Sequence, residues 1–313
     1  MAGGRHLPSQ SFEDQVALMQ ALGRLGSGET FWLGNSTTLS KAKQFGGSNN
    51  NSGESQFSPL STVAAAMAKC KAGRNDNVIM LPGHAESIIA ANGFNVQKAG
   101  ITFLGLGRGT NRPTFTFTTA TTADLEVDAA QTTIENCRFL ASIDELAGAI
   151  DVNAADFRFI GNEVRLTDAT DGTSVQTINF IVSDANGDGM TIKDNFVWGL
   201  GVAAAAGGTH FLYDVGANDV TIHGNYMNAA FTSGEGAIFQ DTAAGRNWDV
   251  QLNRINNTLT GCTVGMSLHA STTGIKHANI WGILGGATPV IAAGMQWGID
   301  WEQGSVGAVA SLV

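Results

Sequence analysis

Charged residues and proline are both scarce in this chain of 313 residues. Aspartate, glutamate, lysine and arginine together make up 14% of it, and it contains 5 prolines. An average globular domain carries about 25% charged residues. So little charge requires the chain to bury much of its surface, in a long core or against other subunits. Glycine is abundant at 40 residues, and many glycines with few prolines favour short strands joined by tight turns.

The chain also lacks an excess of basic residues. Its 17 lysines and arginines stand against 27 aspartates and glutamates, for a formal net charge of −10 at pH 7. This balance argues against a nucleic-acid partner, because nucleic-acid-binding domains usually carry a basic face. An acidic chain is suited to solubility, or to docking onto a partner that has basic patches.

Cysteine is rare, and no hydrophobic run is long. Cys70, Cys137 and Cys262 are widely spaced and form no Cys-x-x-Cys pair, so neither a zinc site of that type nor a disulfide framework is expected. We interpret them as small buried residues of a chain that folds in a reducing compartment. The opening MAGGRHLPSQSF has no apolar signal-peptide core, and no apolar stretch approaches ~18 residues. We therefore expect folding in the cytoplasm and no membrane span.

The N-terminal region begins with an arm and a helix. After an arm over residues 1–10, the apolar residues Phe12, Val16 and Met19 recur at helical spacing. This spacing predicts a helix over residues 11–25. We expect its apolar face to contact a partner or a neighbouring subunit.

A polar loop and a second helix follow within the first 76 residues. Residues 35–56 are rich in glycine, serine and asparagine, which predicts a long loop. A helix over residues 58–72 is indicated by Ser58 as its cap and Pro59 at its first position.

The rest of the chain contains a repeat. Six segments can be superimposed, each an apolar or β-branched strand followed by asparagine and a further apolar residue. They are TTIENCRF (132–139), FRFIGNEV (157–164), MTIKDNFV (190–197), VTIHGNYM (220–227), WDVQLNRI (248–255) and, with a poorer match, IKHANIWG (275–282). The asparagines are Asn136, Asn162, Asn195, Asn225, Asn253 and Asn279. Neighbouring ones lie 26 to 33 residues apart, an interval typical of solenoid repeats.

The repeat predicts an all-β fold, a right-handed parallel β-helix over residues 77–286. Asparagine tolerates the left-handed backbone that sharp corners need. An inward amide can bond the backbone and the asparagine one turn away, so we expect an asparagine ladder that satisfies buried polar groups. The apolar neighbours should then stack into a column made of Ile134, Phe159, Ile192, Ile222 and Val250.

Two motifs resemble ligand-binding loops, and the repeat explains both better. GLGRG at 105–109 runs into the strand-like NRPTFTF, whereas a dinucleotide-binding loop opens a helix. DANGDG at 184–189 matches the start of an EF-hand loop, but Asn195 occupies the position where that loop needs a bidentate glutamate. We interpret it as a corner of the coil.

Carboxylates are the natural candidates for sugar chemistry, because glycosidases use a pair of them. The candidates are Asp184, Asp194, Asp214, Asp241, Asp300 and Glu302, with His210, Tyr213 and His223 near some of them. Asp151, Asp184 and Asp214 fall in equivalent turns and are expected to line one edge of the coil. Turn-forming aspartates in a solenoid are usually structural, and we also interpret His84 as a hydrogen-bonded corner residue. The sequence thus predicts no catalytic residue, metal or cofactor, and a protein that is not an enzyme.

The C-terminal segment, residues 287–313, differs from the repeat in its composition. It contains Trp297 and Trp301, four residues apart, and an apolar tail. A solenoid needs its open end covered, which favours a cap. Tryptophan is also enriched at interface hot spots, which favours an oligomer contact. Both interpretations stay open.

Several stretches together resemble a known family. They are SPLSTVAAAMAKC, NDNVIMLPGHAESI, AGITFLGLGRGTNRPTFTFTTATTADLEV and the TTIENCRF-type repeats. Over roughly residues 30–260 the chain resembles the phage-encoded right-handed β-helix proteins of the pectate-lyase-like superfamily. That resemblance implies that FWLG, the polar loop and the helix from Pro59 cover the first turn of the coil.

The resemblance also implies a function. Members of the group include head decoration proteins and tail spikes, which are commonly trimeric, and some relatives are polysaccharide depolymerases. We expect a virion structural protein, a trimeric capsid decoration (cement) protein that binds the major capsid protein. The alternative is a tail spike or fibre that binds or cleaves a host surface polysaccharide.

Overall fold

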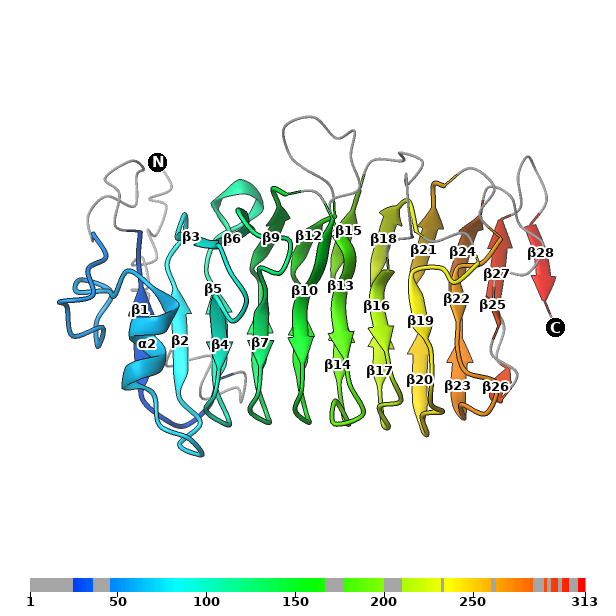
Figure 1. Cartoon of the computed structure of the whole chain (residues 1–313), viewed down its shortest axis with the longest axis horizontal. Helices are drawn as coiled ribbons and strands as arrows, with labels where there is room; N and C mark the ends of the chain where they lie inside the picture. Colours follow the sequence, from blue (N-terminus) through cyan, green and yellow to red (C-terminus); the bar gives the residue numbers. More distant parts are fainter. Residues whose placement is uncertain are drawn as a thin grey trace, which may run out of the picture.

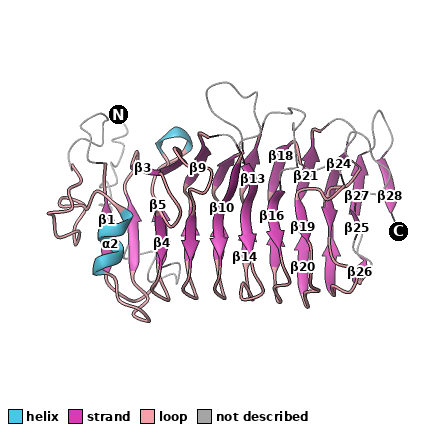
Figure 2. Cartoon of the chain, in the orientation of Figure 1, coloured by secondary structure: helices cyan, strands magenta, loops and turns pink. Residues whose placement is uncertain are grey.

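The computed structural model describes residues 25–35, 46–143, 145–166, 177–199, 210–231, 234–259, 263–283, 290–291, 294–297, 300–303 and 309–312. The expected helix over residues 11–25, with Phe12, Val16 and Met19, lies outside the described residues apart from Leu25. Figure 2 shows that strands dominate the described chain. No helix within the described residues is both long and apolar enough to cross a membrane.

The strands form three sheets that run along an elongated coil (Figure 1). Sheet A consists of β1 (Thr30–Leu33), β2 (Asn77–Met80), β5 (Thr102–Gly105), β8 (Thr133–Glu135), β11 (Arg158–Ile160), β14 (Thr191–Lys193), β17 (Thr221–His223), β20 (Trp248–Gln251), β23 (Gly274–His277) and β26 (Met295–Trp297). Sheet B consists of β3 (Ala85–Ile88), β6 (Thr114–Phe117), β9 (Arg138–Ala141), β12 (Glu163–Arg165), β15 (Phe196–Trp198), β18 (Tyr226–Ala229), β21 (Arg254–Asn257), β24 (Ile280–Ile283), β27 (Asp300–Gln303) and β28 (Val309–Leu312). Sheet C consists of β4 (Phe94–Val96), β7 (Leu125–Val127), β10 (Leu146–Val152), β13 (Thr177–Ser183), β16 (His210–Asp214), β19 (Ile238–Gln240), β22 (Met266–Ser267) and β25 (Val290–Ile291).

Each turn of the coil visits the three sheets in the order A, B, C. Each strand pairs in parallel with the strand one turn before and one turn after it, while β28 pairs antiparallel with β27. The fold is the predicted right-handed parallel β-helix. Trp297 lies in β26 and Trp301 in β27, and their side chains lie outside the described residues.

The interior is a continuous apolar column. Ile134, Phe159, Ile192, Ile222 and Val250 are register partners on successive strands of sheet A, as predicted, and all five are fully buried. Inward and outward side chains alternate along each strand, so one register position stays inside through the whole stack.

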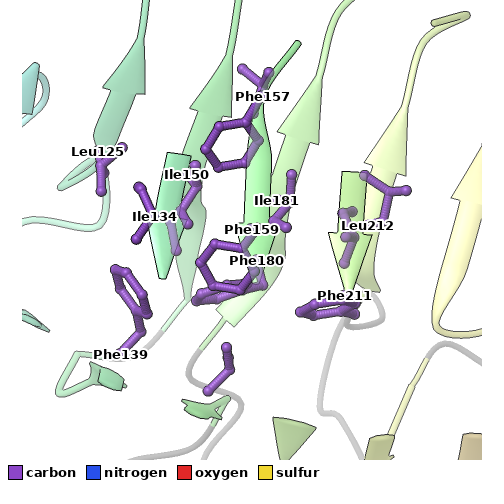
Figure 3. Packing of buried hydrophobic residues seen from close by; sticks show 14 of the residues in the cluster. Leu125, Ile134, Phe139, Ile150, Phe157, Phe159, Phe180, Ile181, Phe211 and Leu212 are labelled. Carbon is purple, nitrogen blue, oxygen red and sulfur yellow. The ribbon is translucent and has the colours of Figure 1, made fainter. Parts of the chain in front are cut away.

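Phenylalanine rings fill the space between the sheets (Figure 3). The ring centroids of Phe139 and Phe159 lie 5.4 Å apart, and those of Phe180 and Phe211 lie 5.8 Å apart with nearly parallel planes. Aromatic pairs at such distances add stability beyond the area they bury.

An asparagine ladder runs along the corner between sheets A and B. Asn195 Nδ2 donates to Asn225 Oδ1 at 2.9 Å, and Asn225 Nδ2 donates to Asn253 Oδ1 at 2.9 Å. Asn253 Nδ2 continues the series to Asn279 Oδ1 at 3.0 Å. The ladder begins at Asn162, whose Nδ2 donates to the carbonyl of Ile134 at 3.0 Å. These amides satisfy backbone groups that the corner would otherwise leave buried and unpaired.

Asn136 does not occupy a ladder position. Cys137 lies there instead, with its N–H donating to Asn162 Oδ1 at 2.8 Å. Asn136 is one residue earlier, at the corner position with φ of 56°. Its Nδ2 donates to the carbonyls of Gly105 and Gly107 at 2.8 and 3.1 Å. The segments superimpose in the correct register, with Ile134 on Phe159, but the assignment of Asn136 to the ladder was wrong because asparagine suits both neighbouring positions.

The residue before each ladder asparagine is left-handed. Gly161 and Gly224 hold this position with φ of 64° and 68°, and Leu252 and Ala278 hold it with φ of 56° and 54°. A left-handed conformation costs a residue with a Cβ about 1–2 kcal/mol. The later corners therefore carry backbone strain that the glycine corners avoid.

The helix of the N-terminal region is shorter than predicted. Helix α2 spans Val63–Lys69, and Thr62 caps it by accepting a hydrogen bond from Ala65 N. Ser58 and Pro59 lie outside the helix because Leu60 is held in extended backbone. Its N–H donates to Trp32 O at 2.8 Å and its carbonyl accepts from Gly34 N at 2.8 Å. The helix contacts β1 and β4 at the first turn of the coil (Figure 1).

A second hydrophobic cluster lies on the outward side of sheet A. It consists of Leu25, Trp32, Ile79, Leu81, Leu104 and Leu106. Trp32, Ile79 and Leu104 are register partners on β1, β2 and β5. Burial on both faces explains why the segment NVIM reads as an apolar run without alternation.

Candidate functional site

The outward side of sheet C carries a continuous row of side chains. Leu125, Ile150 and Leu212 mark the inward positions of this sheet and are fully buried. The next register position faces outward on every strand. From β4 to β19 it holds Asn95, Glu126, Asp151, Val182, Tyr213 and Phe239, here called the sheet C row.

Carboxylates gather at one end of the row. Asn95 Nδ2 donates to Glu126 Oε2 at 3.0 Å and to Asp128 Oδ2 at 3.1 Å. Asn153 Nδ2, from the turn after, donates to Glu126 Oε1 at 3.1 Å and to Asp128 Oδ1 at 3.3 Å. Two amides thus hold two like charges close together. We call Asp124, Glu126, Asp128 and Asp151 the acidic end.

The pKa values in the acidic end are displaced upward. Loss of water raises the pKa of Glu126, and the neighbouring charges of Asp128, Asp124 and Asp151 raise it further. Burial is also the largest cause of the raised pKa of Asp151, followed by the charge of Asp124. Crowded carboxylates disfavour one another's ionised form. These two groups therefore hold a proton at higher pH than isolated carboxyls do.

Aromatic side chains gather at the other end of the row. The Tyr213 hydroxyl donates to Asp241 Oδ2 at 2.6 Å, and this bond is the largest cause of a Tyr213 pKa raised to about 12. The ring centroids of Tyr213 and Phe239 lie 5.6 Å apart. The His210 ring lies 5.2 Å from that of Phe239.

His210 is held between two polar partners beside these rings. Its Nδ1 lies 2.8 Å from Asn179 Oδ1, and its Nε2 lies 3.0 Å from Glu235 Oε2. Burial lowers the pKa of His210, and the Glu235 carboxylate opposes that effect. We call His210, Tyr213, Glu235, Phe239 and Asp241 the aromatic end.

The three aspartates expected along one edge do not share a register position. Asp151 faces outward in the sheet C row. The residue of β16 at the same register position is Tyr213, and Asp214 is one residue further along that strand. Asp214 points inward and is fully buried. It accepts hydrogen bonds from Gly216 N at 2.8 Å and Gln240 Nε2 at 2.9 Å. Burial is the main cause of an Asp214 pKa raised to about 6. A shift of one residue along a strand moves a side chain to the other face, so the expected edge was wrong.

The DANGDG turn is closed by its own hydrogen bonds. Asp184 Oδ1 accepts from Asn186 N at 2.7 Å, and Asp184 Oδ2 accepts from Asn186 Nδ2 at 2.9 Å. Asp188 Oδ1 accepts from Asn218 N in the next turn at 2.7 Å. Within the described part of the chain, no group of three or more His, Cys, Asp or Glu side chains could hold a metal ion.

The other sequence candidates lie away from the sheet C row. Asp194 occupies a left-handed corner with φ of 55°, and His223 ends β17 in sheet A. Asp300 and Glu302 belong to β27, and their side chains lie outside the described residues. Buried His84 lies at the corner before β3 and packs edge-on against Phe115 at 6.3 Å. Its backbone N–H donates to Leu81 O at 3.0 Å. Neither ring nitrogen makes a hydrogen bond to a residue that the structure describes, and Nε2 lies 3.5 Å from Glu86 Oε2, so the expected side-chain hydrogen bond was wrong.

The cysteines that the structure describes are buried and free. They are Cys70 and Cys137, and burial raises the pKa of the Cys70 thiol to about 12. Cys262 lies outside the described residues. After GLGRG the chain forms a short 3₁₀ turn, η1 (Gly109–Asn111), and then strand β6, so this loop opens no α-helix.

The sequence interpretation missed Glu126, Phe239 and Glu235. A signal for Glu126 was present, because the segment LEV alternates apolar and polar residues as a half-buried strand does. Its partners in the row could not be found in the same way. The loops between sheets B and C vary in length, so the register across turns is hidden in the sequence.

No known sequence family matches this chain, and neither does any characterised protein sequence. Its structure does resemble solved ones. A rhamnogalacturonan lyase aligns with a TM-score of 0.54 and 11% identity, over 81% of this chain and 68% of its own. The chain has a polysaccharide-lyase-like fold. Pectate lyase Pel9A aligns with a TM-score of 0.47 and 12% identity, over 87% of this chain and 80% of its own.

The likeness corrects one expectation from the sequence. We expected a protein that is not an enzyme because no catalytic motif stood out. The rhamnogalacturonan lyase is an enzyme that is built on this fold, so the fold contradicts that expectation. At this identity the likeness concerns the fold alone.

Proposed function

We propose that the chain binds a polysaccharide along the outward side of sheet C and cleaves it there. One observation carries the proposal: carboxyl groups with raised pKa values and a cluster of aromatic rings share a single outward row. A straight row on a long parallel sheet suits an extended polymer. The lyase-like fold supports a polysaccharide as the polymer.

The two ends of the row suit two tasks. Tyr213 and Phe239 offer aromatic surface for a sugar ring, and the nearby Asp241 and Glu235 offer hydrogen-bond acceptors for its hydroxyl groups. Binding sites commonly combine aromatic walls with a few fixed polar groups. The aromatic end therefore binds and orients the polymer.

The acidic end suits acid–base chemistry. Glu126 and Asp151 are register partners on the adjacent strands β7 and β10, whose backbones lie about 4.8 Å apart, so the two side chains leave the sheet side by side. Retaining glycosidases use two carboxyl groups about 5–5.5 Å apart, one to protonate the glycosidic oxygen and one to attack the sugar. The raised pKa of Glu126 suits the proton donor. Asp151, in its ionised form, would attack the sugar carbon as the glycosidic bond breaks and Glu126 protonates the departing oxygen. Glu126 would then take a proton from the water that attacks the same carbon and releases the sugar from Asp151.

The test is hydrolysis of a panel of neutral and acidic polysaccharides, followed as new reducing ends. On the substrate that the wild type cleaves, Glu126→Gln and Asp151→Asn should each lower kcat by at least about 100-fold. Asp194→Asn is the matched control, because Asp194 is an exposed carboxylate on a different corner. No cleavage of any substrate, or full activity of Glu126→Gln, would refute the proposal.

This site is compatible with a tail spike or fibre, the alternative that the family resemblance implies. A role as trimeric capsid decoration protein is a second candidate. Exposed Leu252, Ile275 and Ile280 on the later turns of the coil favour it, because exposed apolar side chains often mark contact surfaces. The partners would be two further copies of the chain and the major capsid protein, in the virion.

Copy number separates these two roles. Quantitative mass spectrometry of purified particles should find many copies per particle for a decoration protein and only a few trimers for a spike. Light scattering of the isolated protein measures whether it is trimeric. A monomer that is absent from particles would refute both virion roles and leave the polysaccharide site standing.

A further inference from the structure

The outward side of sheet B carries a second set of side chains, which the proposed cleavage does not use. Phe196, Tyr226 and Arg254 are register partners on β15, β18 and β21. Arg165 and Trp198 are register partners on β12 and β15, two residues along the same strands. We call these five residues the sheet B patch.

The patch is a stack of rings and guanidinium groups. The Phe196 and Tyr226 rings are parallel within 3°, with centroids 5.2 Å apart. The guanidinium of Arg254 lies over the Tyr226 ring at 5.4 Å, and that of Arg165 lies over the Trp198 ring at 4.8 Å. Stacking on a ring holds a guanidinium in place and leaves the N–H groups at its edge accessible. Arg165 Nε donates to Glu163 Oε1 at 3.2 Å, so the other N–H groups of Arg165 are the ones that can meet a ligand. Both arginines are thus positioned before any ligand arrives.

The charge of this face is opposite to that of the whole chain. The outward positions of sheet B from β9 to β21 hold three arginines and one carboxylate. The arginines are Arg138, Arg165 and Arg254, and the carboxylate is Glu163. Arg138 and Arg165 share that carboxylate at 3.3 and 3.2 Å. The face is therefore net positive in a chain of net charge −10. Such a local reversal attracts an anionic partner.

Amide groups extend the patch beside the rings. Asn256 Nδ2 donates to Asn228 Oδ1 at 2.5 Å. This bond fixes the Asn228 amide with its oxygen toward Asn256 and its N–H groups pointing away from Asn256. Phe196 is 44% exposed. Exposed aromatic edges, fixed guanidinium groups and amides on one flat sheet can contact a sugar ring, its carboxylate and its hydroxyls together.

We propose that the sheet B patch binds an acidic saccharide that carries carboxylate groups, with Arg165 and Arg254 as the carboxylate ligands. Arginine pairs with carboxylate through two parallel hydrogen bonds, which gives the contact direction as well as strength. The acidic end of sheet C would repel the same ligand, so the two outward faces select saccharide segments of different charge. This binding site does not depend on the proposed cleavage.

The experiment is titration of the whole protein with hexagalacturonate, by calorimetry and by tryptophan fluorescence. Maltohexaose serves as the neutral probe. The wild type should bind hexagalacturonate more tightly than maltohexaose, with an affinity that falls as salt rises. Arg165→Ala combined with Arg254→Ala should weaken hexagalacturonate binding by at least about tenfold.

Two control variants make the result specific. Arg246→Ala removes an exposed arginine on another corner of the coil and should bind hexagalacturonate as the wild type does. Glu126→Gln should also keep this binding, so loss of cleavage and loss of binding are told apart. Equal affinity for the two probes, or an unchanged double variant, would overturn the proposal. So would light scattering in which the wild type is an oligomer and the double variant is a monomer, because the patch would then be a contact between copies of the chain.

Discussion

The outward faces of sheets B and C share one scaffold and carry opposite chemistry. Both present outward side chains that are in register from strand to strand, above the same apolar interior. The sheet C row contains the carboxyl groups of Glu126 and Asp151. The sheet B patch contains the guanidinium groups of Arg165 and Arg254. Alternation along a strand leaves every second residue free of the core. The coil can therefore hold two unlike surfaces without a change in its packing.

The largest expected effect is on the stability of the coil, which supports both outward faces. Asn225→Ala removes a ladder amide that bonds Ile192 O at 3.0 Å and Asn253 Oδ1 at 2.9 Å. Its loss leaves buried polar groups unpaired, which should lower the free energy of unfolding by about 3–5 kcal/mol. Chemical denaturation measures this. Asn228→Ala, an outward amide three residues away, should cost less than about 1 kcal/mol. Equal losses would mean that the ladder is not the common support.

A second effect belongs to the inner side of sheet C. The raised pKa of Asp214, about 6 against an ordinary 3.8, means that the folded chain binds its proton more tightly than the unfolded chain does. Between about pH 4 and pH 6 stability should thus fall as pH rises, by up to about 3 kcal/mol in total, and level off above. Asp214→Asn should flatten this slope in thermal unfolding curves measured from pH 4 to pH 8. Glu126 and Asp151 also have raised pKa values and should leave a shallower slope. A slope as steep in the variant as in the wild type would show that Asp214 does not cause it.

A smaller change tests whether the two faces act separately. Tyr213→Phe removes the hydroxyl that donates to Asp241 at 2.6 Å and leaves the ring. We expect about a fivefold loss of affinity for the cleaved polysaccharide, the size of one hydrogen bond. Binding of hexagalacturonate at the sheet B patch should not change. A parallel loss at both faces would show that they form one site.

The smallest expected effect concerns the corner below the sheet B patch. Leu252 is 54% exposed and has a left-handed backbone. Leu252→Gly should relieve this strain and raise the free energy of unfolding by about 1 kcal/mol. The same substitution at Ser87, an exposed position in the regular strand β3, should be neutral or destabilising. Stabilisation at both positions would point to an effect outside the corner.

The sequence predicted the coil because its constraints recur in every turn. Asn162, Asn195, Asn225 and Asn253 each meet the same buried corner, so one physical requirement was visible several times. Asn136 shows the limit of that reasoning, since it satisfies a neighbouring corner position equally well. The repeat was strong evidence for the architecture and weaker evidence for its first turn.

The outward faces could not be predicted in the same way. Glu126, Asp151 and Tyr213 share one row only through strand register, which depends on the loops between sheets. Asp214 was grouped with Asp151 although it lies one residue past the outward position and points inward. Outward positions meet no packing constraint that recurs in every turn. The sequence therefore carries no repeated signal for them, and only the structure shows where they lie.

Pairing between successive turns alone gives the coil an unusual mechanical character. Each strand in the interior of a sheet is bonded only to the turn before and the turn after it. A force applied along the axis would therefore unfold the molecule one turn at a time from its end, rather than unfold the whole domain in one step. With turns of about 30 residues, each released turn would lengthen the chain by about 100 Å. Single-molecule pulling should record a regular series of such steps.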